Sequence, residues 1–187
     1  MNRDELRAAL SDRNVRAFLR VIREGESGQT ASAYRMRYGG VGSAPKFFDD
    51  LSRHPKIFER TPDGLMSAAA GAYQATWTTW IETATRWVLP DFSEQSQDEF
   101  AVARLIFRDA LEDVKAGRFD EACRKCSTEW TSLPGGKEEN AATARARATW
   151  EKWLALLEDA QPIDPLATEH YGEAVTESTI RPIPSAD

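Results

Sequence analysis

This 187-residue chain has few of the residues that build metal and redox centres, with two cysteines and two histidines. Cys123 and Cys126 lie three apart in a segment with helical character, and His54 and His170 are distant from them in the sequence. A structural zinc site needs four ligands, and a redox CxxC motif is expected beside a βαβ unit. We therefore expect both cysteines to pack inside the protein, and we expect no metal and no organic cofactor.

Long hydrophobic runs and an excess of positive charge are also missing. Nowhere do 18 apolar residues follow one another, and the N-terminus lacks the basic start and apolar stretch of a signal peptide. We expect synthesis in the cytoplasm and no stable membrane insertion. The net charge is −6, from 24 basic and 30 acidic residues. This balance argues against a nucleic-acid partner, because phosphate binding needs clustered Lys and Arg.

What the chain does have is enough apolar surface for one domain, since 41% of its residues are hydrophobic and 10% are aromatic. We expect residues 1–12 to be an N-terminal extension and residues 13–160 to form the domain. Residues 161–187 contain four prolines and carry a net charge of −4. This acidic tail should be extended or mobile, and the remaining body is then nearly neutral.

Apolar residues at helical spacing predict five helices in the domain. The first is capped by Ser11 or Asn14. The others span about 73–89, 93–117, 119–130 and 140–159, and Ser93 or Ser96 can cap the helix over 93–117. Between residues 27 and 64 there is no helical period. There, alternating apolar residues, a Gly39–Gly40 turn signal and two following phenylalanines predict a short β-hairpin. The expected fold class is therefore α+β, mainly helical, with one small β insertion.

Glu24 is the candidate catalytic residue because it follows an apolar helical stripe and precedes Gly25, a residue expected to end the helix. The stripe consists of Val15, Phe18, Leu19 and Ile22. On the last turn, the negative end of the helix dipole disfavours an ionised carboxylate by roughly 0.3–1 kcal/mol. A carboxylic acid that keeps its proton near neutral pH can protonate a departing glycosidic oxygen. The alternative is a glutamate on a solvated helix end.

Five stretches of sequence, in a fixed order, provide further information. They are REGES around Glu24, YGG and FFDDLSRHP within residues 38–55, SAAAGAYQ at 67–74, DFSEQSQD at 91–98 and CSTEWTSLPG at 126–135. In these motifs and their spacing, residues 13–160 resemble the bacteriophage lambda endolysin family. The resemblance implies a lysozyme-like fold with a β-hairpin insertion flanking the active-site cleft. It also implies cleavage of the β-1,4 bond between N-acetylmuramic acid and N-acetylglucosamine in peptidoglycan.

The resemblance gives Glu24 the role of the single catalytic glutamate of a lytic transglycosylase. Glu24 would protonate the glycosidic oxygen, and the C6 hydroxyl of muramic acid would then close a 1,6-anhydro ring. Tyr73 and Gln74 would bind sugar groups, with core packing and capping as the alternatives. Ser67 would lie behind the residues that contact sugar. His54 is a further candidate for binding substrate, and a hydrogen bond that supports the fold is its favoured alternative.

Hydrolysis by a muramidase remains open at this point. A two-carboxylate mechanism needs a partner about 5–5.5 Å away for retention or 6.5–9.5 Å for inversion. Asp49, Asp50 and Asp63 are the candidates, and Asp50 is also a candidate for binding substrate. Glu26 stands where the lambda-type sequence has threonine. It would either raise the pKa of Glu24 by repulsion or point into solvent.

Three functional classes fit these observations. The first is a monomeric endolysin that a partner holin releases from the host cytoplasm to the periplasm and cell wall, where it binds peptidoglycan glycan strands. The second is a wall-degrading effector or virion-associated lysozyme of the same fold. The third is a helical wall-binding or adaptor protein without activity. The resemblance also implies two mobile lips beside the groove, at residues 55–66 and 133–141.

Overall fold

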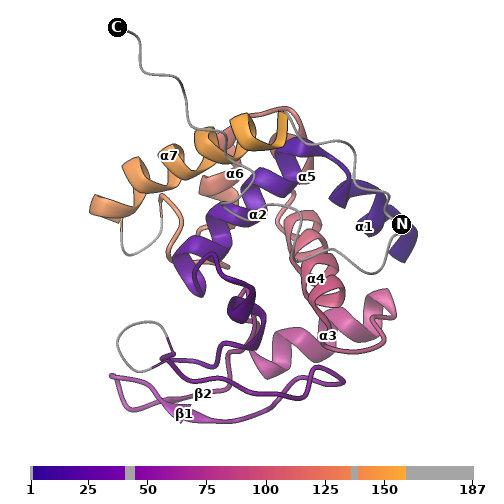
Figure 1. Ribbon diagram of the computed structural model, residues 1–187, viewed down its shortest axis with the longest axis vertical. Helices are drawn as coiled ribbons and strands as arrows, with labels where there is room; N and C mark the ends of the chain where they lie inside the picture. The colour runs from indigo at the N-terminus through magenta and orange to yellow at the C-terminus, as the bar shows by residue number, and fades with distance from the viewer. Residues whose placement is uncertain (1, 41–44, 136–138, 159–187) are drawn as a thin grey trace, which may run out of the picture.

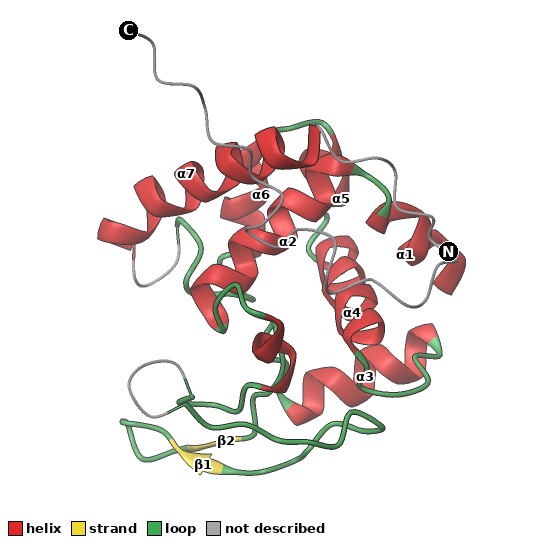
Figure 2. Cartoon of the chain, in the orientation of Figure 1, coloured by secondary structure: helices red, strands yellow, loops and turns green. Residues whose placement is uncertain are grey.

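The computed structural model describes residues 2–40, 45–135 and 139–158, with the backbone alone for 139–144 and 158. The expected acidic tail at 161–187 lies outside the described residues. Helices surround the core, and a small pair of strands lies at one end (Figures 1 and 2). The elements in chain order are α1 Arg3–Leu10, α2 Arg13–Glu26, the 3₁₀ helix η1 Ala31–Arg35, β1 Glu59–Arg60, β2 Met66–Ser67, α3 Trp77–Trp87, α4 Glu94–Phe107, α5 Leu111–Lys115, α6 Phe119–Cys126 and α7 Glu139–Glu158.

The expected N-terminal extension contains helix α1. Asn2 caps the helix by accepting a hydrogen bond from the Glu5 backbone, and the Glu5 side chain accepts one from the Asn2 backbone in return. This capping box satisfies two amides that helical hydrogen bonds leave unpaired. Leu6 is fully buried in the core. The Arg3 and Arg7 guanidinium groups link α1 to α4, because both bind the buried Glu99 carboxylate.

Helix α2 is the central element of the fold. Asp12 begins it by accepting hydrogen bonds from the Asn14 and Val15 amides. The helix continues through Gly25 to Glu26, so the prediction that Gly25 ends it is wrong. Gly28 has the positive φ of 91° that is typical of a helix-ending glycine, and its amide donates to the Arg23 carbonyl at 2.7 Å.

Helix α7 lies across α2 on the side away from the strands (Figure 1). The buried face of α7 includes Trp150, Trp153 and Leu157. The Trp150 ring meets Phe18 of α2 edge-on, with the ring centres 6.1 Å apart. Such aromatic contacts add about 0.5–1.5 kcal/mol beyond the area they bury. The contact between Trp150 and Phe18 therefore helps to hold α7 against α2.

The β structure lies later in the chain than the sequence indicated. β1 and β2 pair antiparallel, with Glu59 opposite Ser67 and Arg60 opposite Met66 (Figure 2, yellow). Residues 31–35 form η1 instead, and this helix includes Tyr34, the first residue of the expected hairpin. Only the isolated bridge between Met36 and Phe47 remains of the predicted pairing among the described residues, and 41–44 at its turn are outside them. The expected fold class, α+β with a small β insertion, is confirmed.

The helices in the second half follow the predicted order with different bounds. α3 ends where Val88 adopts a left-handed conformation, two residues before Pro90. Ser93 caps α4 as expected. The predicted helix over 93–117 is interrupted after Phe107, where Asp109 has a φ of 54°, and resumes as α5. α6 ends at Cys126, four residues before the predicted end. Within the described part of the chain, no helix combines the length and apolar character needed to cross a membrane.

Candidate functional site

A cavity of about 250 Å³ opens where several of the matched motifs meet. It lies among the end of α2, the turn that leads into α3, the C-terminal half of α4 and the segment after α6. Its lining is largely polar. The lining residues are Glu26, Tyr73, Gln74, Ala75, Thr76, Thr79, Phe100, Arg104, Arg108, Thr128, Glu129 and Trp130.

Glu26 brings a carboxylate to the α2 side of this cavity. Its Oε1 atom accepts a hydrogen bond of 2.6 Å from the Ser132 hydroxyl, which belongs to the SLPG stretch. The backbone of α2 and the segment that contains Ser132 approach closely here, because Gly25 has no side chain. A Cβ atom at Gly25 would overlap the Ser132 hydroxyl and lie 2.7 Å from the Ser132 Cβ. Gly25 therefore allows Ser132 to hold the neighbouring glutamate in place.

Glu24 faces the opposite side of α2. Its Oε2 atom accepts hydrogen bonds from the Gln29 amide at 3.0 Å and from the Thr149 hydroxyl of α7 at 2.9 Å. At about 100° per residue, Glu24 is roughly 200° around the helix from the buried Ile22, whereas Glu26 is only about 40° away. The structure thus places the predicted catalytic residue against α7, and Glu24 does not line the cavity.

Tyr73 and Gln74, both predicted to bind substrate, do line the cavity. They lie in a turn before α3, not in the helix as expected. The phenol of Tyr73 is committed to the interior, because it donates to Asp98 at 2.5 Å. The side-chain nitrogen of Gln74 donates to the Gly71 carbonyl at 3.0 Å. Gln74 is therefore held at the cavity wall in a left-handed conformation, with a φ of 46°.

A buried polar network behind Tyr73 fastens α2 to α4. Asp98 accepts hydrogen bonds from the hydroxyls of both Tyr73 and Tyr34, and Arg23 donates to Tyr34 at 3.1 Å. Burial raises the pKa of Asp98 above its ordinary value and raises the pKa of both tyrosines well above theirs. The Trp130 indole donates to the Tyr73 carbonyl at 3.1 Å. These hydrogen bonds hold Tyr73, and with it this part of the cavity wall, in place from the protein interior.

His54 has the supporting role that the sequence predicted. It is buried, its Nε2 lies 2.9 Å from the Ala75 carbonyl, and its Nδ1 accepts a hydrogen bond from the Lys56 amide. These partners assign the proton to Nε2. Burial lowers the pKa of His54, because a charged imidazole would lose its hydration. The ring packs edge-on against Phe92 at 4.8 Å.

The remaining predicted residues lie away from the cavity lining. Ser67, on β2, accepts a hydrogen bond from the Ala69 amide. Asp50 is exposed and accepts hydrogen bonds from the Ser52 hydroxyl and amide, which lower the pKa of its carboxyl. Asp49 and Asp63, the other candidate partner carboxylates, do not line the cavity either.

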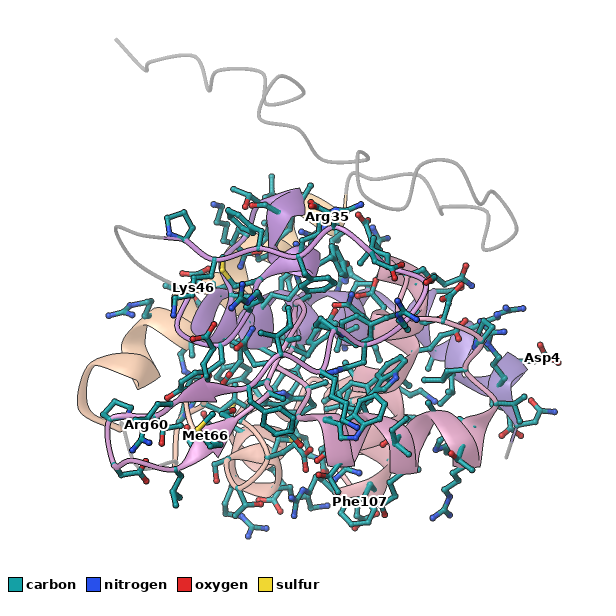
Figure 3. All side chains as sticks on the ribbon, turned by 90° about the horizontal axis from the view of Figure 1, so that it is seen from below. Asp4, Arg35, Lys46, Arg60, Met66 and Phe107 are labelled. Atoms are coloured by element: carbon teal, nitrogen blue, oxygen red, sulfur yellow. The ribbon has the colours of Figure 1, made fainter. Side chains whose placement is uncertain are left out.

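The two expected lips are described in part. Residues 55–66 include β1 and the first residue of β2, and Met66 is 56% exposed. Arg60 and Met66 lie beside each other at the outer edge of the molecule in Figure 3. In the second lip, residues 136–138 lie outside the described part of the chain. The mobility predicted for both lips stays a prediction.

A group of charged residues in the cavity was not foreseen from the sequence. The Arg104 guanidinium makes two hydrogen bonds of 2.9 Å to Glu129, one to each carboxylate oxygen. Arg108 makes two more to Glu129 Oε2, at 2.9 and 2.7 Å. Arg104 and Arg108 are four residues apart and so share one face of α4. That spacing was a readable signal, but nothing in the sequence pointed to Glu129 as their partner.

The two cysteines lie within α6 and are buried as free thiols. Burial raises the pKa of each thiol to about 12, so both stay protonated and unreactive at neutral pH. Both side chains pack inside the protein, as predicted. Over the described ranges, no group of three or more His, Cys, Asp or Glu side chains is arranged to hold a metal ion.

Comparison with known proteins gives consistent results. A family model described as Endolysin matches residues 16–155. The endolysin of Escherichia phage P2 is 35% identical over 134 residues, which cover 65% of this chain and 80% of that protein. The endolysin of Escherichia phage lambda is 36% identical over 90 residues, covering 48% of this chain and 57% of its own length.

Solved structures of a phage lysozyme are also similar to this chain. Bacteriophage lambda lysozyme, in complex with a chitohexasaccharide, superposes with a TM-score of 0.65 at 28% sequence identity. The match covers 75% of this chain and 94% of that one. A second structure of lysozyme from bacteriophage lambda gives a TM-score of 0.64 at 26% identity, covering 75% and 92%.

Proposed function

Because this chain belongs to the endolysin family, we propose that it cuts the β-1,4 bond between N-acetylmuramic acid and N-acetylglucosamine, with Glu26 as the proton donor. Membership makes the protein a phage lysis enzyme that degrades peptidoglycan. The finer assignments of bond, residue and product are our proposal. The observation that carries them is the position of Glu26 in the cavity, hydrogen bonded to Ser132.

The other carboxylate in the cavity is unsuited to donating a proton. Glu129 accepts four hydrogen bonds from the guanidinium groups of Arg104 and Arg108. These charge-assisted bonds occupy both of its oxygens. Glu26 instead accepts a hydrogen bond from the neutral hydroxyl of Ser132. A proton on its carboxyl group could reach the glycosidic oxygen of a sugar chain lying in the cavity.

We propose a reaction in two proton transfers through the same residue. Glu26 gives its proton to the glycosidic oxygen while the bond to the muramic anomeric carbon breaks, releasing the N-acetylglucosamine end. The C6 hydroxyl of the muramic ring then bonds to that carbon and returns its proton to Glu26. No water enters. The product is a 1,6-anhydro sugar, and the enzyme is restored to its starting state.

The surroundings of Glu26 favour this route over hydrolysis with two carboxylates. Retaining and inverting hydrolysis use a second carboxylate across the bond. Among the residues that line the cavity, the only other carboxylate is the fully engaged Glu129. The candidates from the sequence, Asp49, Asp50 and Asp63, lie elsewhere. The chitohexasaccharide complex of lambda lysozyme supports a groove that accepts a linear chain of β-1,4-linked sugars.

The mass of the released muropeptides tests this proposal. Purified peptidoglycan is digested to completion and the fragments are measured by mass spectrometry. Transglycosylation gives fragments that each lack one water relative to a reducing muropeptide. Fragments that retain this water would replace the proposal with hydrolysis, and fragments cut at N-acetylglucosamine would overturn the bond assignment.

Delivery to the wall is part of the same proposal. Relatives named as endolysins support synthesis in the host cytoplasm followed by release to the periplasm. We propose that a phage holin opens that route without binding the enzyme, and that the enzyme acts as a monomer on glycan strands. Lysis of cells expressing the protein with and without a holin tests the route. Lysis at the same time in both cultures would contradict it.

A further inference from the structure

The part of the cavity wall formed by Arg104, Arg108 and Glu129 carries more positive than negative charge. Arg104 and Arg108 share the single carboxylate of Glu129, so one positive charge is left over among the three. The side chains of Arg104 and Glu129 are 9% and 10% exposed, and that of Arg108 is 28% exposed. All three line the same cavity as Glu26. While Glu26 carries the proton that it donates in the proposed reaction, this partly buried excess charge favours an anionic ligand.

Arg108 is the member of this group best placed to receive a ligand. Its Nε and Nη2 atoms are bound to Glu129, which fixes the plane of the guanidinium. Its Nη1 atom makes no hydrogen bond to any described residue. The Phe107 ring lies beneath both arginines, with its centre 4.2 Å from Arg104 and 5.3 Å from Arg108. Figure 3 places Phe107 at the outer surface of the molecule.

Arg104 has a different part in the group. It forms the bidentate pair with Glu129, and its Nη1 lies 3.5 Å from the Thr83 hydroxyl of α3. Its guanidinium therefore has partners on two sides. Arg104 holds Glu129, and Glu129 in turn orients Arg108. A pre-oriented guanidinium loses little freedom when a ligand binds, which favours specific recognition of a carboxylate.

We propose that Arg108, oriented by Glu129, binds a carboxylate of the muramyl unit while the sugar chain lies against Glu26. This proposal rests on the proposed function, because it uses the same cavity. Peptidoglycan carries such groups on its stem peptides, and a strand stripped of its peptides carries them on the lactyl ethers. Chitin has neither. Arg108 would therefore distinguish wall glycan from other β-1,4 glycans, and it would offset the repulsion between an anionic strand and a protein of net charge −6.

The test compares wild type and Arg108→Gln on three ligands: intact peptidoglycan, glycan strands freed of peptide by an amidase, and chitohexaose. Loss of a charge-assisted hydrogen bond should raise KM about tenfold on the carboxylate-bearing substrate that Arg108 recognises, with kcat within about twofold. Dissociation constants for chitohexaose should be unchanged. An effect confined to intact peptidoglycan identifies a stem-peptide carboxylate, and one confined to stripped strands identifies the lactyl carboxylate.

Two further variants separate recognition from structural support. Arg108→Lys keeps the charge and should recover part of the lost affinity. Arg124→Gln makes the same change in net charge at a site that pairs with Glu121 and is 68% exposed, and it should leave KM unaltered. Unfolding midpoints are recorded for all variants. Unchanged KM on both anionic substrates, or an equal loss of chitohexaose binding, would overturn the proposal.

The proposed function and this inference fail in different ways. If wild-type protein cleaves neither anionic substrate, the proposed function fails. Direct binding of the stripped strands and of intact muropeptides, with chitohexaose as the reference, then still compares wild type with Arg108→Gln. Weaker binding of either anionic ligand to the variant supports the carboxylate site in that case, and equal binding of both excludes it.

Discussion

At the scale of single residues, Gly25 matters for the space it leaves. The sequence suggested a helix-ending role, but Gly25 lies inside α2 and the Ser132 side chain occupies the place of its missing Cβ. Gly28 is the residue whose φ of 91° requires glycine, and nothing lies within 4 Å of a Cβ added there. Gly25 therefore matters for the geometry of the site, and Gly28 matters for the end of the helix.

We predict opposite outcomes for alanine at these two positions. Gly25→Ala should push Ser132 away from Glu26 and lower kcat about tenfold, while alanine's better helix propensity offsets part of the steric cost to stability. Gly28→Ala should lower the free energy of unfolding by about 1–2 kcal/mol because of its left-handed backbone, with activity retained. Wall-clearing rates and urea unfolding measure both effects. Equal loss of activity in the two variants would show that Ser132 does not position Glu26.

The burial of His54 predicts that the stability of the protein depends on pH. Its pKa is lowered in the folded protein by burial, so the unfolded chain binds the proton more readily. The stabilisation is fully present above the unfolded pKa of about 6.5 and is lost as the pH falls through the folded pKa. Urea unfolding at pH 7.5 and pH 5.5 should therefore give a lower free energy at the acid value.

His54→Gln is the matched variant for this effect. Glutamine can still donate to the Ala75 carbonyl but does not titrate. The difference in unfolding free energy between pH 7.5 and pH 5.5 should shrink in this variant. An identical difference in both proteins would assign the pH dependence to other groups.

The choice between the two neighbouring glutamates, Glu24 and Glu26, stays a prediction at the residue scale. The motif resemblance favoured Glu24 because a Glu-Gly pair was expected there. The apolar stripe contained the opposite signal, since Glu26 continues the face formed by Val15, Leu19 and Ile22, and Glu24 does not. The sequence could not predict the group formed by Arg104, Arg108 and Glu129, because it joins the end of α4 to a segment more than 20 residues away.

At the scale of elements, helices were more readily predicted than strands. Long apolar periods located α2, α3, α4, α6 and α7. Ser93, one of the two predicted caps of α4, is its cap, whereas Asp12 caps α2 in place of the predicted Ser11 or Asn14. The break between α4 and α5 was missed because the apolar spacing continues through Asp109. β1 and β2 contain two residues each, which is too short for an alternating pattern to predict their register.

Helix α1 provides a test at this scale. Residues 1–12 were expected to be an extension, yet Leu6 is completely buried in the core. Leu6→Ala should lower the free energy of unfolding by about 2–5 kcal/mol, as for other buried leucines. The control is Leu65→Ala, since Leu65 is 66% exposed, and it should change stability by no more than about 0.5 kcal/mol. Equal stabilities of the two variants would mean that α1 does not contribute to the core.

At the scale of the whole molecule, α2 connects the core to the proposed chemistry. α7 lies across α2 (Figure 1), and the C-terminal end of α2 contributes Glu26 to the cavity lining. Glu24 thereby contributes to the helix–helix contact and Glu26 to the cavity. The overall lysozyme-like plan and the endolysin family were predictable from motif order. The orientation of α2 depends on packing against α7, which a one-dimensional pattern does not specify.

The most direct test of this account compares Glu26→Gln with Glu24→Gln in clearing outer-membrane-permeabilised Gram-negative cells. Both substitutions replace a carboxyl group by an amide of nearly the same shape, and they lie within one helical turn of each other. Glu26→Gln should lower the clearing rate by at least about a hundredfold, the usual contribution of a general acid, at an unchanged circular dichroism spectrum. Glu24→Gln should clear within a few-fold of wild type. Full activity of Glu26→Gln, together with an inactive but folded Glu24→Gln, would contradict the account.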